Sequence, residues 1–195
     1  MYAKLCCVPD LNVLDGVDDV PWRDLRHAYG AAHDLPALLR ALGSGSGEAD
    51  EALEALFASI CHQGTVYSAT PHAVPFLARN AAAGDLGTLV LGLLGCIAES
   101  EDEYGLEVPG SARAAVAGQI GVLAPLLSDP DDEVRATAVW ALTQCRAPGR
   151  VVPLLRECWD AERQPPVRAT VLKGLSVLDP GDGGCHRSRC PGPSR

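Results

Sequence analysis

An internal repeat in the C-terminal half of the chain restricts the possible folds more than any other feature. The segments VRATAVWAL at 134–142 and VRATVLKGL at 167–175 share five identical positions at an offset of 33 residues. A proline followed by two leucines precedes each segment, at Pro125 and at Pro153. A period of this length is typical of helical repeats, in which each unit is one helix, a turn and a second helix. We therefore expect stacked helix pairs.

Two earlier segments carry the same combination of a proline and apolar residues. They are DLPALLRAL at 34–42 and AVPFLARNA at 73–81, and an apolar run follows each of them. The chain of 195 residues thus accommodates about four helix pairs. The second helices of these pairs are expected at 50–62, 85–98, 131–145 and 165–178.

Each second helix is expected to bury one face. In the helix at 131–145 the apolar residues fall on one stripe of a 3.6-residue helix, and they are Val134, Ala138, Ala141, Leu142 and Cys145. A single helix pair cannot cover such a face, so the pairs must stack on one another. The predicted fold class is all-α, an α-α superhelix whose second helices line one surface.

The segment SDPDDEVRATAVWAL at 128–142 resembles the second half of a HEAT repeat, where an Asp-rich turn precedes a helix that opens with Val-Arg. The resemblance covers 120–178 well and 34–98 more loosely, and bilin-lyase-like HEAT repeats are the most similar in length. The segments 22–42 and 62–77 also resemble uncharacterised actinobacterial HEAT-repeat proteins. The resemblance implies a HEAT-like solenoid that binds other proteins.

Three parts of the chain are expected to differ in how well they are folded. Residues 1–21 are predicted to be an irregular N-terminal segment, 22–178 the repeat domain, and 179–195 a disordered tail. The tail holds no aliphatic residue over 181–195, so it cannot cover the last helix. A solenoid that stops at Leu178 would expose its last apolar face, which indicates a truncated or frameshifted end, or a partner on that face.

Net charge and hydropathy argue against nucleic acids and membranes as partners of this chain. The formal net charge is −9, from 25 acidic and 16 basic residues, and this balance repels nucleic acids and anionic membrane surfaces. No apolar run approaches the roughly 18 residues of a membrane span, and no signal peptide opens the chain. We expect a cytoplasmic protein without a cofactor, whose cysteines (Cys61, Cys96, Cys145 and Cys158 among them) are reduced and structural.

The stretch CHQGTVYSATPHAVPFL at 61–77 has two interpretations. The functional one is a metal or nucleophile cluster of Cys61, His62 and His72, since thiolates and imidazoles bind zinc. The structural one is a joint between helices. It assigns a helix C-cap to Gly64, an N-cap to Thr65 or Thr70, the first helical turn to Pro71 and a kink to Pro75. The joint explains more of these residues and is preferred.

Two further features each have a functional and a structural interpretation. The acidic insertion ESEDEYGLE at 99–107 could bind a basic partner or a divalent cation, but a solvated loop is favoured because the calcium-loop spacing is missing. Trp140 aligns with Lys173 of the next unit. It is therefore either an exposed binding anchor or a residue packed between repeats.

The sequence favours a non-enzymatic scaffold for protein–protein interaction, with a protein partner of unknown identity. The candidate partner-binding residues are Trp140, Arg135, Arg168, Lys173, His62 and Tyr67. The alternative is a lyase-like, hydrolytic or metal-dependent enzyme subunit that uses Cys61, His62 and Tyr67. No histidine precedes a glutamate, so the chain lacks the ligand dipeptides of HEAT-type iron hydroxylases.

Overall fold

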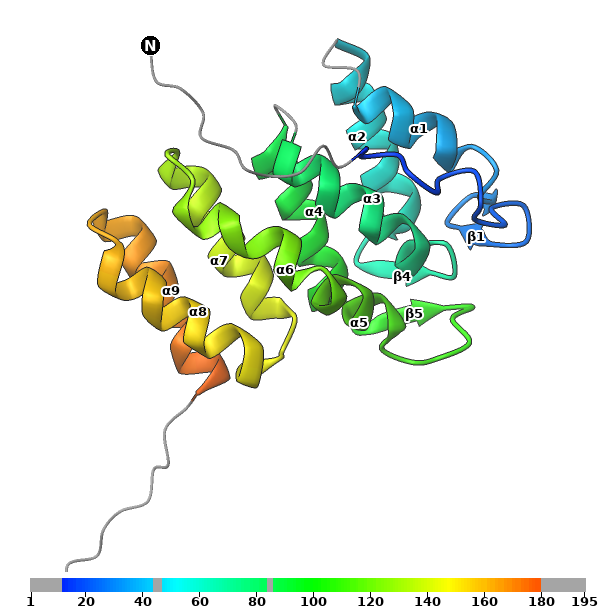
Figure 1. Cartoon of the computed structure of the whole chain (residues 1–195). Helices are drawn as coiled ribbons and strands as arrows, with labels where there is room; N and C mark the ends of the chain where they lie inside the picture. Colours follow the sequence, from blue (N-terminus) through cyan, green and yellow to red (C-terminus); the bar gives the residue numbers. More distant parts are fainter. Residues whose placement is uncertain (1–11, 44–46, 84–85, 180–195) are drawn as a thin grey trace, which may run out of the picture.

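The computed structural model describes residues 12–43, 47–83 and 86–179, and its helices are stacked in pairs along the chain (Figure 1). The pairs are α1 (Leu35–Leu42) with α2 (Gly47–Ile60), α3 (Thr70–Ala83) with α4 (Gly87–Glu99), α5 (Ser111–Gly118), α6 (Ile120–Leu123) and η1 (Ala124–Ser128) with α7 (Asp132–Gln144), and α8 (Pro148–Ala161) with α9 (Pro165–Leu178). This arrangement confirms the predicted all-α superhelix of about four helix pairs.

The second helices form one layer of the stack. Helix α7 packs against α4 on one side and α9 on the other, and α3 packs against α5 in the second layer. The core runs between the two layers and includes Leu94, Val116, Leu142 and Leu155, all of which are fully buried. In Figure 1 the chain therefore progresses from α1 and α2 at one end of the stack to α8 and α9 at the other.

Local sequence explains why α7 begins where it does. The Asp131 carboxylate accepts a hydrogen bond of 2.9 Å from the backbone N–H of Glu133, which satisfies one of the free donors of the first turn. Asp132 and Glu133 place further negative charge at the positive end of the helix dipole. The acidic turn that is part of the repeat pattern is thus a helix start.

The first helix of the third pair is interrupted, in contrast to the others. Helix α5 ends at Gly118, and α6 and the 3₁₀ helix η1 follow as short pieces. Gly118, Gly121 and Pro125 lie in this stretch, and each residue type is unfavourable inside an α-helix. The interruption therefore follows from composition, although the repeat pattern alone predicts one continuous first helix.

Two glycines allow close approach between neighbouring repeats. An added Cβ at Gly95 of α4 would lie 2.0 Å from Cζ3 of Trp140 in α7. An added Cβ at Gly174 of α9 would lie 2.6 Å from the Thr143 hydroxyl and 3.0 Å from Leu155. The half-buried Trp140 side chain is thus packed between repeats, which is one of its two predicted environments.

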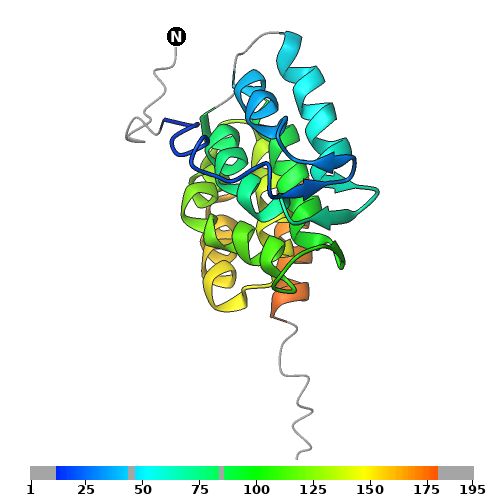
Figure 2. The ribbon, with the colours of Figure 1, turned by 90° about the vertical axis from the view of Figure 1, so that its right-hand side faces the viewer.

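Short strands interrupt the helical stack near its first two pairs. One hairpin consists of β1 (Arg26–His27) and β2 (Gly30–Ala31), and a second sheet contains β3 (Cys61–His62), β4 (Thr65–Tyr67) and β5 (Asp102–Tyr104). The helix expected over 50–62 is present as α2, but the prediction is wrong for Cys61–His62, which form β3, and for Gly64 as the helix C-cap. Helix α2 ends at Ile60, and Gly64 lies in the turn of a β-hairpin. Figure 2 shows the two sets of strands along the same edge of the molecule.

Several other expectations lie partly outside the described residues. Residues 12–21 form turns, while 1–11 and 180–195 fall outside the described ranges and so does most of the expected disordered tail. Within the part of the chain that is described, no helix combines the length and hydropathy needed to cross a membrane.

Candidate functional site

Three segments that are far apart in the sequence meet around one hollow. The hollow has a volume of about 400 Å³, and its lining includes Arg26, His27, Tyr29, Thr65, Tyr67 and Tyr104. These residues come from the β1–β2 hairpin, from β4 and from β5. Residues from the stretch at 61–77 and from the acidic insertion at 99–107 therefore line the same hollow, although they are separate features in the sequence.

The β3–β4 hairpin owes its shape to its two-residue turn. Gln63 has φ 52° and Gly64 has φ 86°, while Cys61 pairs with Val66 and His62 with Thr65. Positive φ at both central residues defines the turn type that matches the twist of a two-residue hairpin. A glycine is favourable at the second position because it has no Cβ. The glycine that was expected to stop a helix instead reverses a strand.

Thr70 joins this hairpin to the helices on either side. Its hydroxyl donates to the carbonyl of Ile60 at 2.7 Å and accepts from the backbone N–H of Tyr67 at 2.9 Å. The side chain is fully buried, so both contacts replace lost bonds to water. Thr70 thus connects the end of α2 to the strand before α3, a different role from the predicted helix N-cap.

Strand β5 brings the acidic insertion into the sheet. It runs parallel to β4, with Thr65 opposite Asp102 and Tyr67 opposite Tyr104. The Glu103 carboxylate accepts from the backbone N–H of Gly110 at 2.8 Å and 3.0 Å, which closes the loop after the strand. Asp102–Tyr104 are exposed, as expected for a solvated segment, but the expectation of a loop is wrong for these residues because they form a strand paired with β4.

The β1–β2 hairpin is held in place by a buried histidine. His27 is 7% exposed, its Nε2 lies 2.8 Å from the Asp34 carboxylate, and its Nδ1 accepts from the backbone N–H of Tyr29. Because Nδ1 is an acceptor, the Nε2 proton is the one donated to Asp34. The hairpin is also joined to the helical stack, since the N–H of Ala28 donates to the carbonyl of Ser59. His27 thereby holds the backbone of Tyr29 in place, and with it the position from which the Tyr29 side chain extends.

Three tyrosines, Tyr29, Tyr67 and Tyr104, are part of the lining of the hollow. The Tyr29 ring lies edge-on to His62 with a centroid distance of 5.6 Å, and the rings of Tyr67 and Tyr104 are 6.1 Å apart. Tyr29 is 69% exposed and Tyr104 is 63% exposed. Large aromatic side chains held in fixed positions on the surface are typical of binding hot spots.

His62 is half-buried and lies against Tyr29 at the edge of the hollow, whereas Cys61 faces the core. Adjacent strand residues point to opposite sides of a sheet, and Cys61 is 7% exposed. Burial raises the pKa of the Cys61 thiol to about 11, and the neighbouring Cys96 adds to this effect. The thiol is therefore protonated at neutral pH, and it is a poor nucleophile or metal ligand. His62 donates through Nδ1 to the carbonyl of Ala58 at 3.0 Å, which orients its ring beside Tyr29.

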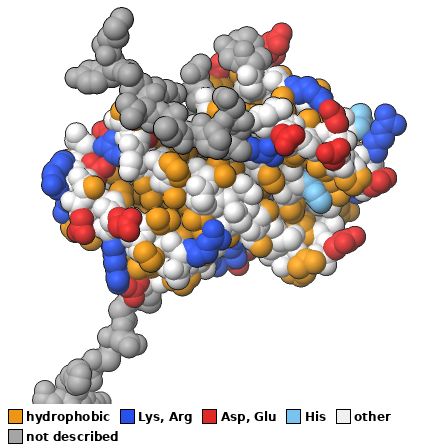
Figure 3. Space-filling model, viewed as in Figure 1, with side chains coloured by type: hydrophobic (Ala, Val, Ile, Leu, Met, Phe, Trp, Pro, Cys, Tyr) orange, Lys and Arg blue, Asp and Glu red, His pale blue; other side chains and the backbone are white. Residues whose placement is uncertain are grey.

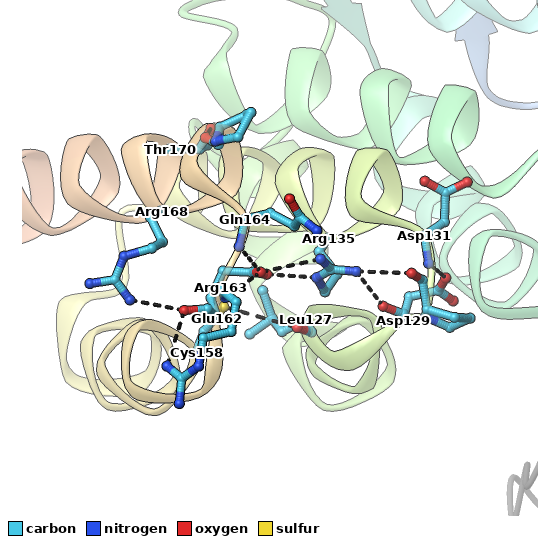
Figure 4. A network of polar contacts seen from close by, with 12 residues as sticks. Leu127, Asp129, Asp131, Arg135, Cys158, Glu162, Arg163, Gln164, Arg168 and Thr170 are labelled. Carbon is cyan, nitrogen blue, oxygen red and sulfur yellow. Dashed lines mark hydrogen bonds and ion pairs between the residues drawn. The ribbon is translucent and has the colours of Figure 1, made fainter.

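A polar network between the last two repeats contains two other predicted site residues. Arg135 donates to both carboxylate oxygens of Glu162, at 2.7 Å and 3.2 Å, and to the carbonyls of Asp129 and Pro130 (Figure 4). The hydrogen bond from Arg135 is the main reason why the pKa of Glu162 falls to about 2. Arg168 stacks on Trp159 at 3.6 Å. Both arginines thus have structural partners, whereas Lys173 is exposed.

A second hollow of about 540 Å³ lies beside this network, between η1 and α8. Arg135, Cys158 and Glu162 are part of its lining. Burial raises the pKa of the Cys158 thiol, with Glu162 as the next cause. Arg135 and Glu162, two of the charged residues in its lining, are already paired with each other.

The arrangement of acids and histidines also bears on metal binding. Among the described residues, no three side chains of His, Cys, Asp or Glu are grouped so that they could hold a metal ion. His72 is exposed on α3, and the structure does not bring it together with Cys61 and His62 as a ligand set. On the face in Figure 3, basic and acidic side chains are intermixed, and no basic stripe is visible there.

Comparison with known protein families supports the repeat interpretation. Residues 120–182 match the family of HEAT repeats. This range holds α6, η1, α7, α8 and α9, which includes both copies of the internal repeat. Searches of curated proteins and of solved structures give no match. The narrower resemblance to bilin-lyase-like and actinobacterial repeats stays a prediction.

Sequence reasoning identified His62 and Tyr67 but missed Tyr29 and Tyr104. The two missed tyrosines become neighbours of the predicted pair only through the pairing of β5 with β4 and the docking of the β1–β2 hairpin. One usable signal was present, because Gln63-Gly64 is a two-residue turn between short runs with β-forming residues.

Proposed function

We propose that the protein is a non-enzymatic scaffold that binds a protein partner through the aromatic hollow. The observation that carries the proposal is the group of tyrosines that short strands hold at the surface: Tyr29, Tyr67 and Tyr104, with His62 beside them. Within the described residues, the three tyrosine hydroxyls have no hydrogen-bond partner, so they are available to a ligand. The helical stack supplies the rigid support for this surface.

The match to HEAT repeats supports the same class of function, because these repeats generally act as protein-interaction scaffolds. The net charge of −9 favours a protein over a nucleic acid or an anionic membrane as the partner. Cys61, Cys96, Cys145 and Cys158 are free thiols, and this supports a cytoplasmic location. The protonated, buried Cys61 thiol argues against an enzyme built on Cys61, His62 and Tyr67.

Quantitative affinity capture tests the proposal. The baits are the wild-type protein, a Tyr29→Ala/Tyr104→Ala variant, and a Leu89→Ala control, which alters a side chain that is 53% exposed on α4. A partner should bind the wild type and the control, and we expect its affinity for the double variant to fall by at least about tenfold, as for hot-spot tyrosines. The captured partner is then titrated against all three purified proteins.

Two results would contradict the scaffold proposal. One is a partner that binds the double variant as tightly as the wild type. The other is stoichiometric zinc or iron in the purified protein that disappears on changing His62 or Cys61, since that result would favour the metal-dependent enzyme subunit.

A further inference from the structure

The last helix of the stack exposes an apolar position that is buried one repeat earlier. The offset of 33 residues places Leu172 of α9 at the position of Val139 in α7, and Leu175 at the position of Leu142. Val139 and Leu142 are fully buried in α7, which lies between α4 and α9. Leu172 is 52% exposed, and Leu175 is half-buried, with part of its side chain packed against the core. Within the described residues, the face of α9 that corresponds to the covered face of α7 has no helix packed on it (Figure 1).

Arg135 and Arg168 are equivalent residues in the two repeats, and they also differ in whether a following repeat contacts them. Arg135 uses Nη1 for the carbonyls of its own preceding turn, and it uses Nε and Nη2 for the Glu162 carboxylate of the next repeat. Arg168 also uses Nη1 for two backbone carbonyls that precede its helix, those of Trp159 at the end of α8 and of Glu162 in the following turn. The described residues provide no acceptor for its Nε and Nη2. This edge of Arg168 therefore faces the position where a next carboxylate would lie.

The face of α9 that carries the exposed Leu172 and the half-buried Leu175 has a spacing that is complementary to itself. Arg168, Leu172, Leu175 and Asp179 follow one another at intervals of four, three and four residues, which is the seam of a heptad repeat. In two antiparallel copies of such a helix, the first position of one seam lies opposite the last position of the other. Arg168 then lies opposite Asp179 of the second copy, and Leu172 lies opposite Leu175. The two helices would thus contact each other through four residue pairs, two of opposite charge and two apolar.

We propose that a second copy of this chain docks on this face of α9, in an antiparallel helix pair with two-fold symmetry. The Arg168 edge and the Asp179 carboxylate supply opposite charges in this register. Residues 181–195 hold no aliphatic side chain and are a poor cover for Leu172. The face shares no residue with the aromatic hollow, so the proposal stands or falls separately from the proposed function.

The expected dimer is weak. A single pair of 14-residue helices buries less than the roughly 1,200–2,000 Å² of total surface that stable interfaces bury. A dissociation constant in the micromolar range is therefore expected, and dimerisation should depend on protein concentration over about 1–500 μM.

Sedimentation velocity with the full-length chain over that concentration range tests the proposal. Leu172→Glu places a carboxylate in the apolar layers and should weaken the dimer at least about tenfold. Leu89→Glu is the matched control, because Leu89 is 53% exposed on α4, and it should leave the dissociation constant unchanged. Arg156→Gln removes the 2.6 Å ion pair of Asp179 within one copy, and it should leave the dimer intact.

Charge reversal tests the antiparallel register. Arg168→Glu and Asp179→Arg should each abolish dimerisation alone, since each creates two pairs of like charge. An equimolar mixture of the two variants should form a heterodimer, because both pairs are then opposite in charge. Circular dichroism of each variant establishes that it is folded, and Leu172→Glu tests the same face without changing an arginine that contacts the backbone.

Three outcomes would overturn the proposal. They are a protein that stays monomeric at every concentration, a dimer that Leu172→Glu does not weaken, and charge-reversal variants that fail to associate when mixed. Association of the α9 face with a different protein alone, while the purified chain stays monomeric, belongs to the first outcome.

Discussion

At the scale of single residues, contacts between repeats depend on pairs of one large and one small side chain. Trp140 lies against Gly95, and Thr143 lies against Gly174. The alignment of Trp140 with Lys173 did not reveal this, because the relevant partner is on another helix. A role for Trp140 in partner binding stays a prediction, and its packing role leads to a stability test.

We expect Gly95→Ala to destabilise the protein by about 1–3 kcal/mol, because the new methyl group would overlap the Trp140 ring. Trp140→Ala should cost about 2–4 kcal/mol through the cavity that it leaves. In the double variant the cost of Gly95→Ala should largely vanish, so the two effects are strongly coupled. Urea denaturation of the four proteins measures the coupling.

Gly92→Ala is the matched control on the same helix. An added Cβ at Gly92 meets no atom within 4 Å, so the change should stabilise α4 by up to about 1 kcal/mol through helix propensity. Additive effects of Gly95→Ala and Trp140→Ala would show that the two side chains do not determine the spacing of α4 and α7.

The ion pair between Arg135 and Glu162 gives a prediction for pH. The pKa of Glu162 is lowered from 4.5 to about 2, mainly by the hydrogen bond from Arg135, so the folded state favours the ionised carboxylate. The resulting stability is present above the unfolded-state pKa, and it is lost as the pH falls from about 5 to about 2. Glu162→Gln should therefore cost about 2 kcal/mol at pH 7 and almost nothing at pH 2.

Thermal or urea unfolding at several pH values between 7 and 2 checks this prediction. Glu157→Gln serves as the control, because Glu157 is an exposed acid on α8 with no ion-pair partner among the described residues. A stability difference between the wild type and Glu162→Gln that stays constant over this pH range would show that the Glu162 charge does not stabilise the fold.

At the scale of elements, the β3–β4 hairpin forms part of the proposed binding surface at the joint between α2 and α3. Its turn places Gln63 and Gly64 at positive φ, and its second strand carries Tyr67 and pairs with β5. The chemistry of the turn therefore determines how well the tyrosines are positioned. Because the hairpin strands have only two and three residues, a change in the turn should measurably change the stability of the hairpin.

We expect Gly64→Ala to lower the free energy of unfolding by about 1 kcal/mol, because a Cβ is unfavourable at φ 86°. Gln63→Asn should stabilise the protein slightly, since Asn-Gly is the preferred pair in this turn type. Thermal unfolding of both variants tests the assignment. Equal melting temperatures for Gly64→Ala and the wild type would contradict the importance of this turn.

At the scale of the whole molecule, the stack has two surfaces with different properties. The aromatic hollow lies among the strands packed near the first two helix pairs, and the exposed seam of α9 lies at the other end of the stack. Because the two surfaces share no residue, binding of a partner at the hollow should leave the proposed self-association intact. The Tyr29→Ala/Tyr104→Ala variant is therefore expected to sediment like the wild-type protein at equal concentration.

The sequence by itself determined the helical stack. The offset of 33 residues, the heptad-like apolar stripes and the Asp-rich turn before α7 all act over a few helical turns, so local periodicity is enough to predict them. The same reasoning failed at Cys61–Tyr67, because a stretch of seven residues has no periodicity that separates a helix end from a hairpin. It also failed at Asp102–Tyr104, whose strand exists only because β4 lies beside it.

Only the tertiary structure decided which side chains share a surface. Tyr29, Tyr67 and Tyr104 lie on three segments that are separated by more than 30 residues, and strand pairing and hairpin docking bring them together. It also decided that Arg135 is paired with Glu162 while the Nε and Nη2 edge of Arg168 faces outward, although both arginines open the same sequence motif. The physical reason is that a repeat fixes the positions along one helix, whereas burial depends on whether another helix packs on it.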